Sequence, residues 1–335
     1  MADTLMSMSK ILVTGGTGFL GGCLVRRLVA TGHAVRALVR SPEKSKALAD
    51  LGVEIVLGDV TQPASLSQAM AGIDLVYHIA ATFRQQNISD KNMWAINCQG
   101  VQNMLDAAIA AGTVQHFVHC STIGVHGNII NPPANEETPY APGDVYQASK
   151  TGGEKIAIEY LKQGKLPITV FRPGGIYGPG DMRFLKLFRS IKKQRFVMLG
   201  SGEVLYSLIY IDDLIDGILL CGNHPNALGK IYILTGEPAL TLNEFVATIA
   251  EVIGKPLPKW HIPVSPVYFT SFICEMTGKL FGFEPPLYRR RVDFFRKDRS
   301  FSLAKARYEL SFFPRVDIKA GLTCTALWYQ EQGLL

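Results

Sequence analysis

Tyr146 and Lys150 are the residues of this chain best suited to chemistry, because they form a Tyr-x-x-x-Lys pattern. Residues four positions apart share one face of a helix, so the phenol and the ammonium would be neighbours. A nearby cation favours the phenolate and lowers a tyrosine pKa from about 10 toward neutral pH. The pair therefore predicts a general acid for a substrate oxygen, although the same pattern also occurs by chance on solvated helices.

A glycine-rich turn near the start of the chain supports this interpretation. Residues 10–14 are apolar and β-branched, as in a buried parallel strand, and residues 22–30 have the spacing of a helix. Glycines between a strand and a helix let the backbone approach a pyrophosphate, and the helix N-terminus attracts its charge. The predicted cradle consists of Gly15, Thr17, Gly18, Phe19, Leu20 and Gly21.

The end of the second predicted strand, residues 34–39, bears on the choice between NAD and NADP. An NAD enzyme usually has an acidic residue here for the ribose 2′-hydroxyl, but this chain has Val39 and then Arg40, with Lys44 nearby. A guanidinium can pair with a 2′-phosphate, so we expect NADP(H) to be favoured over NAD(H). The alternative for Arg40 is an ordinary solvated cation.

Three further predicted strands end in residues that would lie at the carboxyl edge of a sheet, where doubly wound folds bind ligands. Asp59, with Val60, follows the strand at 53–57 and could accept the adenine amino group, although aspartates also begin turns. Ala80 and Ala81 end the strand at 75–81 and would let a cofactor pack against backbone. Thr122 follows the strand at 116–120, where its hydroxyl could hydrogen-bond an oxygen that gains charge.

With these segments in order, the sequence resembles the extended short-chain dehydrogenase/reductase family over nearly its whole length. The matching motifs are TGGTGFLG at 14–21, GDV at 58–60, HIAA at 78–81, CSTIGVHG at 120–127, YQASK at 146–150, RPGGIYGPG at 172–180 and YIDDL at 210–214. The resemblance implies an α/β fold, with a Rossmann doubly wound parallel sheet of about seven strands and a smaller C-terminal substrate-binding domain. The expected parts are 10–175 with 207–235 for NAD(P), and 176–206 with 236–330 for the substrate.

The resemblance also implies roles for particular residues. Thr122, Tyr146 and Lys150 would be the catalytic trio, with Lys150 also binding the nicotinamide ribose. Pro173 and Gly174 would run along the nicotinamide. Asn97 would support catalysis, by ordering the active-site backbone or a proton-relay water.

Three departures favour a ketone or secondary alcohol over a nucleotide sugar. Sugar dehydratases usually follow the catalytic threonine with Asp-Glu, whereas this chain has residues 123–124, Ile-Gly. Nucleotide-sugar enzymes often carry Asn where Gly175 stands and Arg where Tyr206 stands, and losing a bidentate cation removes a main handle for phosphate. His126 also replaces a common tyrosine, without an assigned consequence.

The C-terminal half adds a hint about the substrate. The apolar stretch at 262–273, continuing through Met276, Leu280, Phe281 and Phe283, could wall a pocket for a bulky apolar molecule or be an ordinary core helix. Residues 301–322 are similar to the closing segment of 3β-hydroxysteroid dehydrogenase and dihydroflavonol reductase relatives. We therefore expect hydride transfer to or from a hydrophobic ring-bearing substrate, steroid-like or flavonoid-like. The alternatives are a nucleotide-sugar epimerase that retains NAD and a non-catalytic NAD(P)-sensing protein.

Composition and charge indicate the setting of the protein. With 335 residues, 47% of them hydrophobic, and no apolar core at residues 1–9, we expect a cytoplasmic enzyme. Six widely spaced cysteines predict reduced thiols, and no Cys/His cluster predicts a metal site. Residues 289–299, from Arg289 to Arg299, have a net charge of +4. They could form a solvated face of the C-terminal part, rest on an anionic membrane surface, or contact an anionic part of the substrate or cofactor. We expect no nucleic-acid binding, and a homodimer by analogy only.

Overall fold

A parallel sheet of seven strands is the centre of the computed structural model, which describes residues 9–83, 88–258, 260–281 and 289–335. The strand order is β11-β6-β5-β4-β1-β2-β3, so the chain starts inside the sheet, builds one edge and then returns to build the other. All neighbouring strands are parallel, which confirms the predicted doubly wound sheet. The strands are β1 Lys10–Thr14, β2 Ala34–Val39, β3 Glu54–Leu57, β4 Leu75–His78, β5 His116–Cys120, β6 Ile168–Pro173 and β11 Ile231–Leu234. The fourth strand ends at His78 and does not reach residue 81 as expected.

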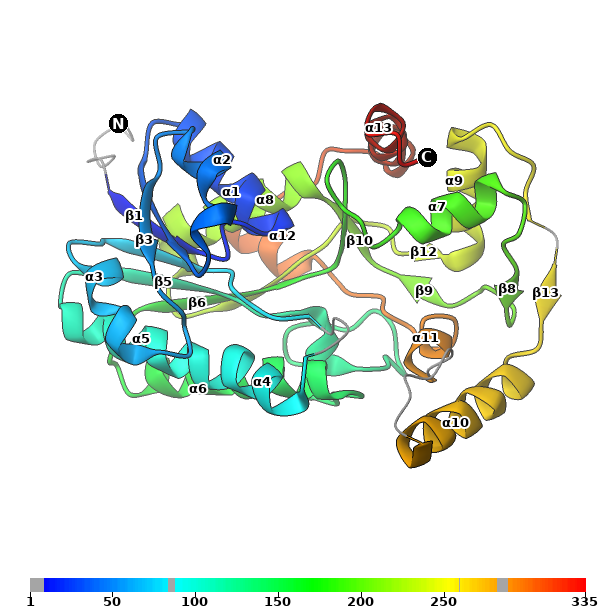
Figure 1. The fold of residues 1–335 in the computed structure, drawn as a ribbon, viewed down its shortest axis with the longest axis horizontal. Coiled ribbons are helices and arrows are strands. Elements are labelled where there is room, and N and C mark those ends of the chain that lie inside the picture. The colour runs from blue at the N-terminus through cyan, green and yellow to red at the C-terminus, as the bar shows by residue number, and fades with distance from the viewer. Residues whose placement is uncertain (1–8, 84–87, 259, 282–288) are drawn as a thin grey trace.

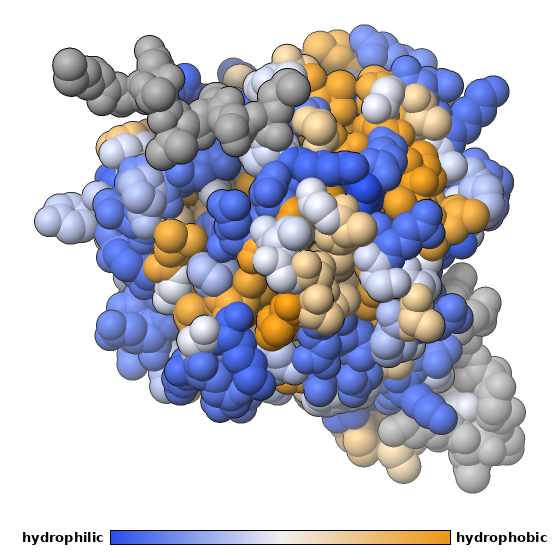
Figure 2. All heavy atoms as spheres, turned by 90° about the vertical axis from the view of Figure 1, so that its left-hand side faces the viewer, coloured by the Kyte–Doolittle hydropathy of each residue, from blue (hydrophilic) through white to orange (hydrophobic). Residues whose placement is uncertain are grey.

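Helices cover both faces of this sheet (Figure 1). Alternate side chains of β1 point to opposite faces, so Ile11 and Val13 belong to one apolar core and Leu12 to the other. The helices around the sheet are α1 Phe19–Ala30, α2 Lys46–Ala49, α3 Ser67–Met70, α4 Asp90–Trp94, α5 Gly100–Ala111, α6 Val145–Lys162, α8 Ile211–Asn223 and α12 Ala304–Leu310. Figure 2 shows the end of the molecule that contains the sheet, on the left of Figure 1. Hydrophilic side chains cover much of this surface and surround hydrophobic ones.

A smaller part of the chain lies beyond the other end of the sheet (Figure 1). Outside the main sheet the structure contains three short strand pairs: β7 with β10, β9 with β12, and β8 with β13. The pairs comprise β7 Gly175–Tyr177, β8 Met198–Leu199, β9 Leu205–Tyr206, β10 Leu208–Tyr210, β12 Leu240–Thr241 and β13 His261–Ile262. The helices here are α7 Leu185–Lys192, α9 Leu242–Val252, α10 Val264–Phe281, α11 Arg289–Asp293 and α13 Ile318–Glu331.

The apolar stretch of the C-terminal half forms β13 and α10. Phe269 and Met276 of α10 are 64% and 55% exposed, so the alternative of an ordinary core helix is wrong. Phe283 and the side chains of Leu280 and Phe281 lie outside the described residues. Within residues 9–335, as far as they are described, the structure contains no helix with the length and apolarity needed to cross a membrane.

Candidate active site

A cavity of about 440 Å³ lies at the carboxyl ends of the sheet strands. It brings together segments as far apart in sequence as Thr14 and Arg183, because parallel strands place their carboxyl ends at one edge. Most of the residues expected at the cofactor and the reacting groups line it. They are Gly15, Thr17, Gly18, Phe19, Leu20, Gly21, Arg40, Lys44, Val60, Ala80, Ala81, Thr122, Tyr146, Pro173 and Gly174.

The glycine turn is shaped by close backbone packing at one side of this cavity. Gly15 has φ +74°, and a Cβ there would lie 2.8 Å from the amide nitrogen of Ala80. A Cβ on Gly21 would collide with the carbonyl oxygen of Gly15. Larger residues would therefore push the turn away from the edge of the sheet.

The N-terminus of α1 faces the same cavity without a capping side chain. Gly18 is the N-cap residue and has no side chain to accept the first N–H groups of the helix. These N–H groups are available to an anion, and the helix dipole favours negative charge at this end. The residues present therefore fit the pyrophosphate of a dinucleotide.

Helix α6 presents Tyr146 to the cavity and buries Lys150 one turn later. Asp144 caps the helix by accepting a hydrogen bond from the amide of Gln147 at 2.8 Å, which fixes where the helix begins. The Tyr146 ring packs edge-on against Phe83, with 5.0 Å between centroids. Lys150 is 2% exposed and does not line the cavity. The predicted pair is thus one helical turn apart, with the phenol at the cavity and the ammonium beneath it.

Thr122 lies just after β5 and lines the cavity together with Tyr146. Its Oγ1 accepts a hydrogen bond from the amide of Gly124 at 3.1 Å and caps a short 3₁₀ turn, Ile123–His126. A hydroxyl that accepts one hydrogen bond still has its own hydrogen to donate. Thr122 can therefore donate to an oxygen bound in the cavity.

Asn97 is buried and holds the backbone of a cavity residue. Its Oδ1 accepts from the amide of Thr82 at 2.8 Å, and its Nδ2 donates to the carbonyl oxygen of Thr82 at 2.9 Å and to Ser149 Oγ at 3.0 Å. Asn97 sits in a π-helical turn, Ala95–Gln99, an irregularity often found at functional sites. The geometry fits the first of its two expected roles, ordering the active-site backbone.

The residues expected at the adenine end of the cofactor divide into two groups. Arg40 and Lys44 are exposed and line the cavity, as NADP binding would require. Asp59 does not line it, and its Oδ1 accepts hydrogen bonds from the amide and the hydroxyl of Thr61, both at 2.8 Å. The adenine contact of Asp59 therefore stays a prediction that depends on its other carboxylate oxygen.

Arg183 is a cavity residue that sequence reasoning missed. Its Nε donates to Asp181 at 2.7 Å, its Nη2 donates to the carbonyl oxygen of Ile176 at 2.6 Å, and its guanidinium lies 5.9 Å from the centroid of the Phe19 ring. These contacts hold a positive charge beside the glycine turn. No local pattern predicts this approach, because Arg183 follows Phe19 by more than 160 residues.

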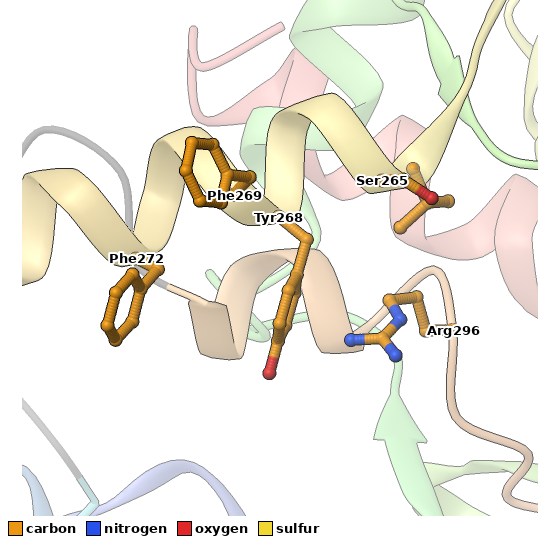
Figure 3. A pocket seen from close by; sticks show the side chains of 6 residues that line it. Ser265, Tyr268, Phe269, Phe272 and Arg296 are labelled. Atoms are coloured by element: carbon orange, nitrogen blue, oxygen red, sulfur yellow. The ribbon is translucent and has the colours of Figure 1, made fainter.

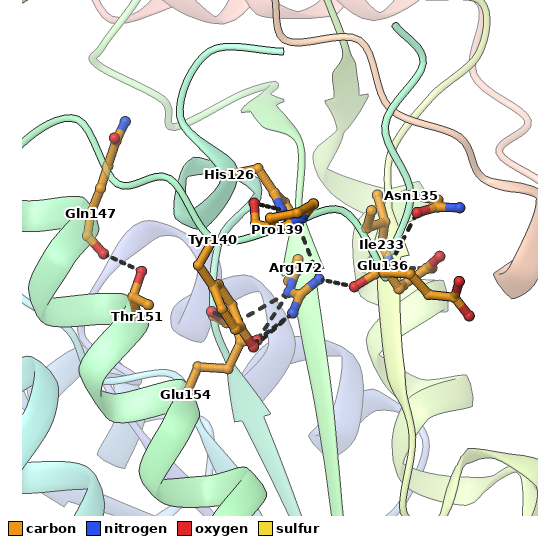
Figure 4. A network of polar contacts seen from close by, with 12 residues as sticks. His126, Asn135, Glu136, Pro139, Tyr140, Gln147, Thr151, Glu154, Arg172 and Ile233 are labelled. Atoms are coloured by element: carbon orange, nitrogen blue, oxygen red, sulfur yellow. Dashed lines mark hydrogen bonds and ion pairs between the residues drawn. The ribbon is translucent and has the colours of Figure 1, made fainter. Parts of the chain in front are cut away.

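A buried ion pair lies behind the cavity (Figure 4). The Nε atom of Arg172 donates to both oxygens of Glu154, at 3.1 and 3.2 Å, and Ser121 and Tyr140 also donate to this carboxylate. Burial by itself would raise the pKa of Glu154, but the hydrogen bonds and the charge of Arg172 hold it below its usual range. Ser121 precedes Thr122 and Arg172 precedes Pro173, so the pair anchors two strand ends that line the cavity.

The same network gives a structural role to His126, the residue that replaces a common tyrosine of the family. Arg172 Nη1 lies 3.0 Å from His126 Nε2, and His126 Nδ1 lies 3.2 Å from the carbonyl oxygen of Pro139 (Figure 4). Burial and the nearby Arg172 lower the pKa of His126. A neutral ring that donates from Nδ1 and accepts at Nε2 satisfies both neighbours.

A doubly wound sheet, a glycine turn before an uncapped helix, and Tyr146 at the same cavity with Lys150 beneath it together define an NAD(P)-dependent oxidoreductase. The chain belongs to the NAD dependent epimerase/dehydratase family, whose sequence model matches residues 11–234. This confirms the extended short-chain dehydrogenase/reductase family that the motifs predicted. Among the residues that the structure describes, no group of three or more His, Cys, Asp or Glu could hold a metal ion.

Two curated relatives and one solved structure illustrate the range of this family. Over 96% of its length the chain is 31% identical to a 3 beta-hydroxysteroid dehydrogenase/Delta 5→4-isomerase of Mycobacterium tuberculosis, and the match covers 90% of that protein. It is also 31% identical to a 2-alkyl-3-oxoalkanoate reductase of Stenotrophomonas maltophilia, covering 93% of this chain and 97% of the relative. The crystal structure of DesIV, a dTDP-glucose 4,6-dehydratase from Streptomyces venezuelae with NAD bound, superposes with a TM-score of 0.76 at 25% identity, covering 96% of this chain and 97% of that one.

Proposed function

We propose that this protein reversibly transfers a hydride between NADP(H) and the carbonyl or secondary alcohol carbon of a hydrophobic ring-bearing substrate, steroid-like or flavonoid-like. The observation that carries this proposal is that Tyr146 and Thr122 line the same cavity as the glycine turn. A carbonyl oxygen placed between the two hydroxyls would lie at the edge of the sheet where the dinucleotide binds.

In the reductive direction, Tyr146 donates its proton to the carbonyl oxygen, and Thr122 hydrogen-bonds the same oxygen as it gains charge. Lys150 acts through its charge, which favours the tyrosine phenolate left behind and lowers the cost of proton transfer. The nicotinamide supplies the hydride when it is bound. Asn97 keeps Thr82 in place at the wall of the cavity.

The preference for NADP(H) rests on Arg40 and Lys44, which line the cavity at the end of β2. Val39 stands where an acidic residue would serve NAD, so the side chain at this position does not repel a 2′-phosphate. NAD(H) is the alternative cofactor, and cofactor titrations with the two nucleotides distinguish them.

The packing around Tyr206 supports a substrate other than a nucleotide sugar. A Cβ added to Gly175 would lie 2.8 Å from Cε1 of the Tyr206 ring, so this ring fills the space that an asparagine would need. The same ring packs edge-on against Phe294 at 5.4 Å, and the Arg299 guanidinium lies 5.5 Å from its centroid. The Tyr206 ring thus occupies one of the two positions that often serve the nucleotide diphosphate and fills the space beside the other. The name of the 3 beta-hydroxysteroid dehydrogenase relative also supports a ring-bearing alcohol.

The second candidate function is a nucleotide-sugar epimerase that retains NAD, favoured by the family description and by the likeness to DesIV. Such an enzyme would bind a nucleotide sugar and release no net NAD(P)H. A non-catalytic NAD(P)-sensing protein is a more remote candidate, because it would not need both Tyr146 and Lys150.

One experiment tests the proposal directly. Purified protein is mixed with NADPH or NADH and with steroid-like, flavonoid-like and small keto compounds, and oxidation of the cofactor is followed at its absorbance band. We expect turnover with a ring-bearing ketone, preferably with NADPH, and its loss in Tyr146→Phe. Full turnover by Tyr146→Phe would refute the mechanism, and tight NADP binding without turnover on any compound would favour the sensor.

We also propose a division of the chain into two functional parts, a location and an oligomeric state. Residues 10–175 with 207–235 would bind the cofactor, and residues 176–206 with 236–330 would bind the substrate. We propose that the protein is cytoplasmic, which cell fractionation would test, and that it forms a homodimer, which light scattering would test.

A further inference from the structure

Helix α10 has a stripe of exposed apolar side chains. Phe269, Phe272, Ile273 and Met276 are 64%, 40%, 45% and 55% exposed. Their spacing of three, four and seven residues places them on one face of the helix. A contiguous apolar stripe exposed to water generally marks a contact surface.

The segment that packs against this helix contains most of the net charge of the protein. Residues 289–299, which begin with α11 beside α10, contain six Lys or Arg and two Asp, so they account for +4 of the total +6. A surface that combines positive charge with an apolar stripe fits an apolar partner that is also anionic.

Two arginines lie directly beside the aromatic side chains of α10. The Arg296 guanidinium is 4.2 Å from the centroid of the Tyr268 ring, and the Arg289 guanidinium is 5.1 Å from that of Phe272. Their side chains are 41% and 40% exposed although each also pairs with a carboxylate, Asp293 and Glu275 respectively. The charges are thus held next to the helix and still reach solvent.

A groove of about 460 Å³ runs along the junction of these groups (Figure 3). Its walls are mainly apolar, and Tyr268 and Arg296 extend toward the same space beside α10. The residues lining it are Val264, Ser265, Tyr268, Phe269, Phe272 and Arg296. The groove could hold part of a lipid chain below a headgroup bound by Arg296.

We propose that α10 docks the protein onto the surface of an anionic lipid membrane. The apolar stripe enters the boundary between headgroups and acyl chains, and Arg289 and Arg296 bind the phosphates of the headgroups. The helix lies in the interface and does not cross the bilayer, in agreement with its lack of a spanning segment. A second copy of the chain is a poorer occupant, because two segments of the same positive charge would repel each other.

The test uses the full chain without substrate or cofactor, so it does not depend on the proposed reaction. Protein is sedimented with vesicles of phosphatidylcholine alone and with vesicles of equal parts phosphatidylcholine and phosphatidylglycerol. We expect binding to the anionic vesicles only, weakened by salt because surface electrostatic attraction is screened. Equal binding to both vesicles, or to neither, would overturn the proposal.

Matched variants then identify the surface. The double variant Phe269→Ser with Phe272→Ser should weaken binding to anionic vesicles by about tenfold or more, and Arg289→Gln with Arg296→Gln should do likewise. Ile130→Ser and Tyr308→Ser are controls, because these side chains are 84% and 91% exposed in other parts of the fold. Circular dichroism and the midpoint of thermal unfolding confirm that each variant is folded. Unchanged vesicle binding by both double variants would contradict docking on lipid through α10. Docking would also be contradicted if light scattering shows that the wild type is a dimer and that the double variant Phe269→Ser with Phe272→Ser is a monomer.

Discussion

The ammonium of Lys150 donates a hydrogen bond to the main-chain oxygen of Cys120, 2.6 Å away and two residues before Thr122. Burial lowers the pKa of Lys150 below its usual range, although Glu154 one turn further along α6 acts in the opposite direction. One buried cation therefore contacts the strand end that leads to Thr122, while its own helix carries Tyr146. A change at Lys150 should affect both hydroxyls of the site.

Lys150→Gln should lower the rate of carbonyl reduction by about a hundredfold or more, because proton transfer from Tyr146 loses its nearby charge. In the direction of alcohol oxidation, the phenolate that accepts the proton should form only at higher pH. The rising limb of the pH profile of kcat/KM should therefore move to higher pH. Steady-state kinetics across pH measures this shift, with Lys162→Gln, an exposed lysine of the same helix, as the control. An unchanged pH profile in Lys150→Gln would remove the tuning role of this lysine.

The sheet could be predicted from sequence because each of its signals is local. A buried strand such as β6 is an uninterrupted run of buried residues, and the helix after β1 follows directly from the glycine turn. One expectation and one of two open alternatives failed at places where tertiary contacts decide. The fourth strand ends at His78, because the amide of Ala80 bonds to the side chain of Thr14 instead of extending the strand. The exposed face of α10 could not be read from its apolar composition.

The site was predictable for a related reason, since a doubly wound sheet gathers the residues that follow its strands. Thr122 needed only its position at a strand end to be placed at the cavity, whereas Pro173 was placed there by the family resemblance. Arg183 was missed because it approaches Phe19 from a distant segment. The partners of Glu154 were missed in the same way, since no spacing rule joins it to Arg172 on a different element.

Arg40→Asp should change the choice of cofactor. We expect the KM for NADPH to rise by about 10- to 100-fold, because a charge-assisted pair with the 2′-phosphate is replaced by repulsion. The KM for NADH should change little or fall, since a carboxylate can accept from the ribose 2′-hydroxyl. Kinetics with both cofactors measures the ratio, and Lys46→Asp, an exposed cation nearby that does not line the cavity, is the control. Equal effects on both cofactors would show that Arg40 does not read the 2′-phosphate.

Arg183→Gln should weaken both cofactors alike, in contrast to Arg40→Asp. The guanidinium lies beside the Phe19 ring at the start of α1, where it can contact the pyrophosphate that NADP and NAD share. We expect the Kd of each nucleotide to rise by about tenfold, as measured by titration of protein fluorescence. Arg189→Gln, an exposed arginine that donates to the carbonyl oxygen of Leu334, is the matched control. A loss confined to carbonyl substrate, with unchanged nucleotide Kd, would instead assign Arg183 to the substrate.

His119→Leu should make the protein less sensitive to acid. His119 is fully buried against His78, with 5.6 Å between ring centroids, and neither of its ring nitrogens has a hydrogen-bond partner among the described residues. Burial, with the nearby Lys150, lowers the pKa of His119 and lowers that of His78 to about 3.

The sign of the effect follows from proton binding. As pH falls through about 6.5, the unfolded chain takes up protons that the buried rings do not, so the free energy of unfolding decreases. Leucine removes one of these sites without removing a hydrogen bond. Between pH 6.5 and 4 the variant should therefore lose less stability than the wild type, by about 1 kcal/mol or more. Urea unfolding at several pH values measures this difference, and titration of the carboxylates cancels because both proteins share it. Parallel curves for His119→Leu and the wild type would mean that the buried ring does not resist protonation.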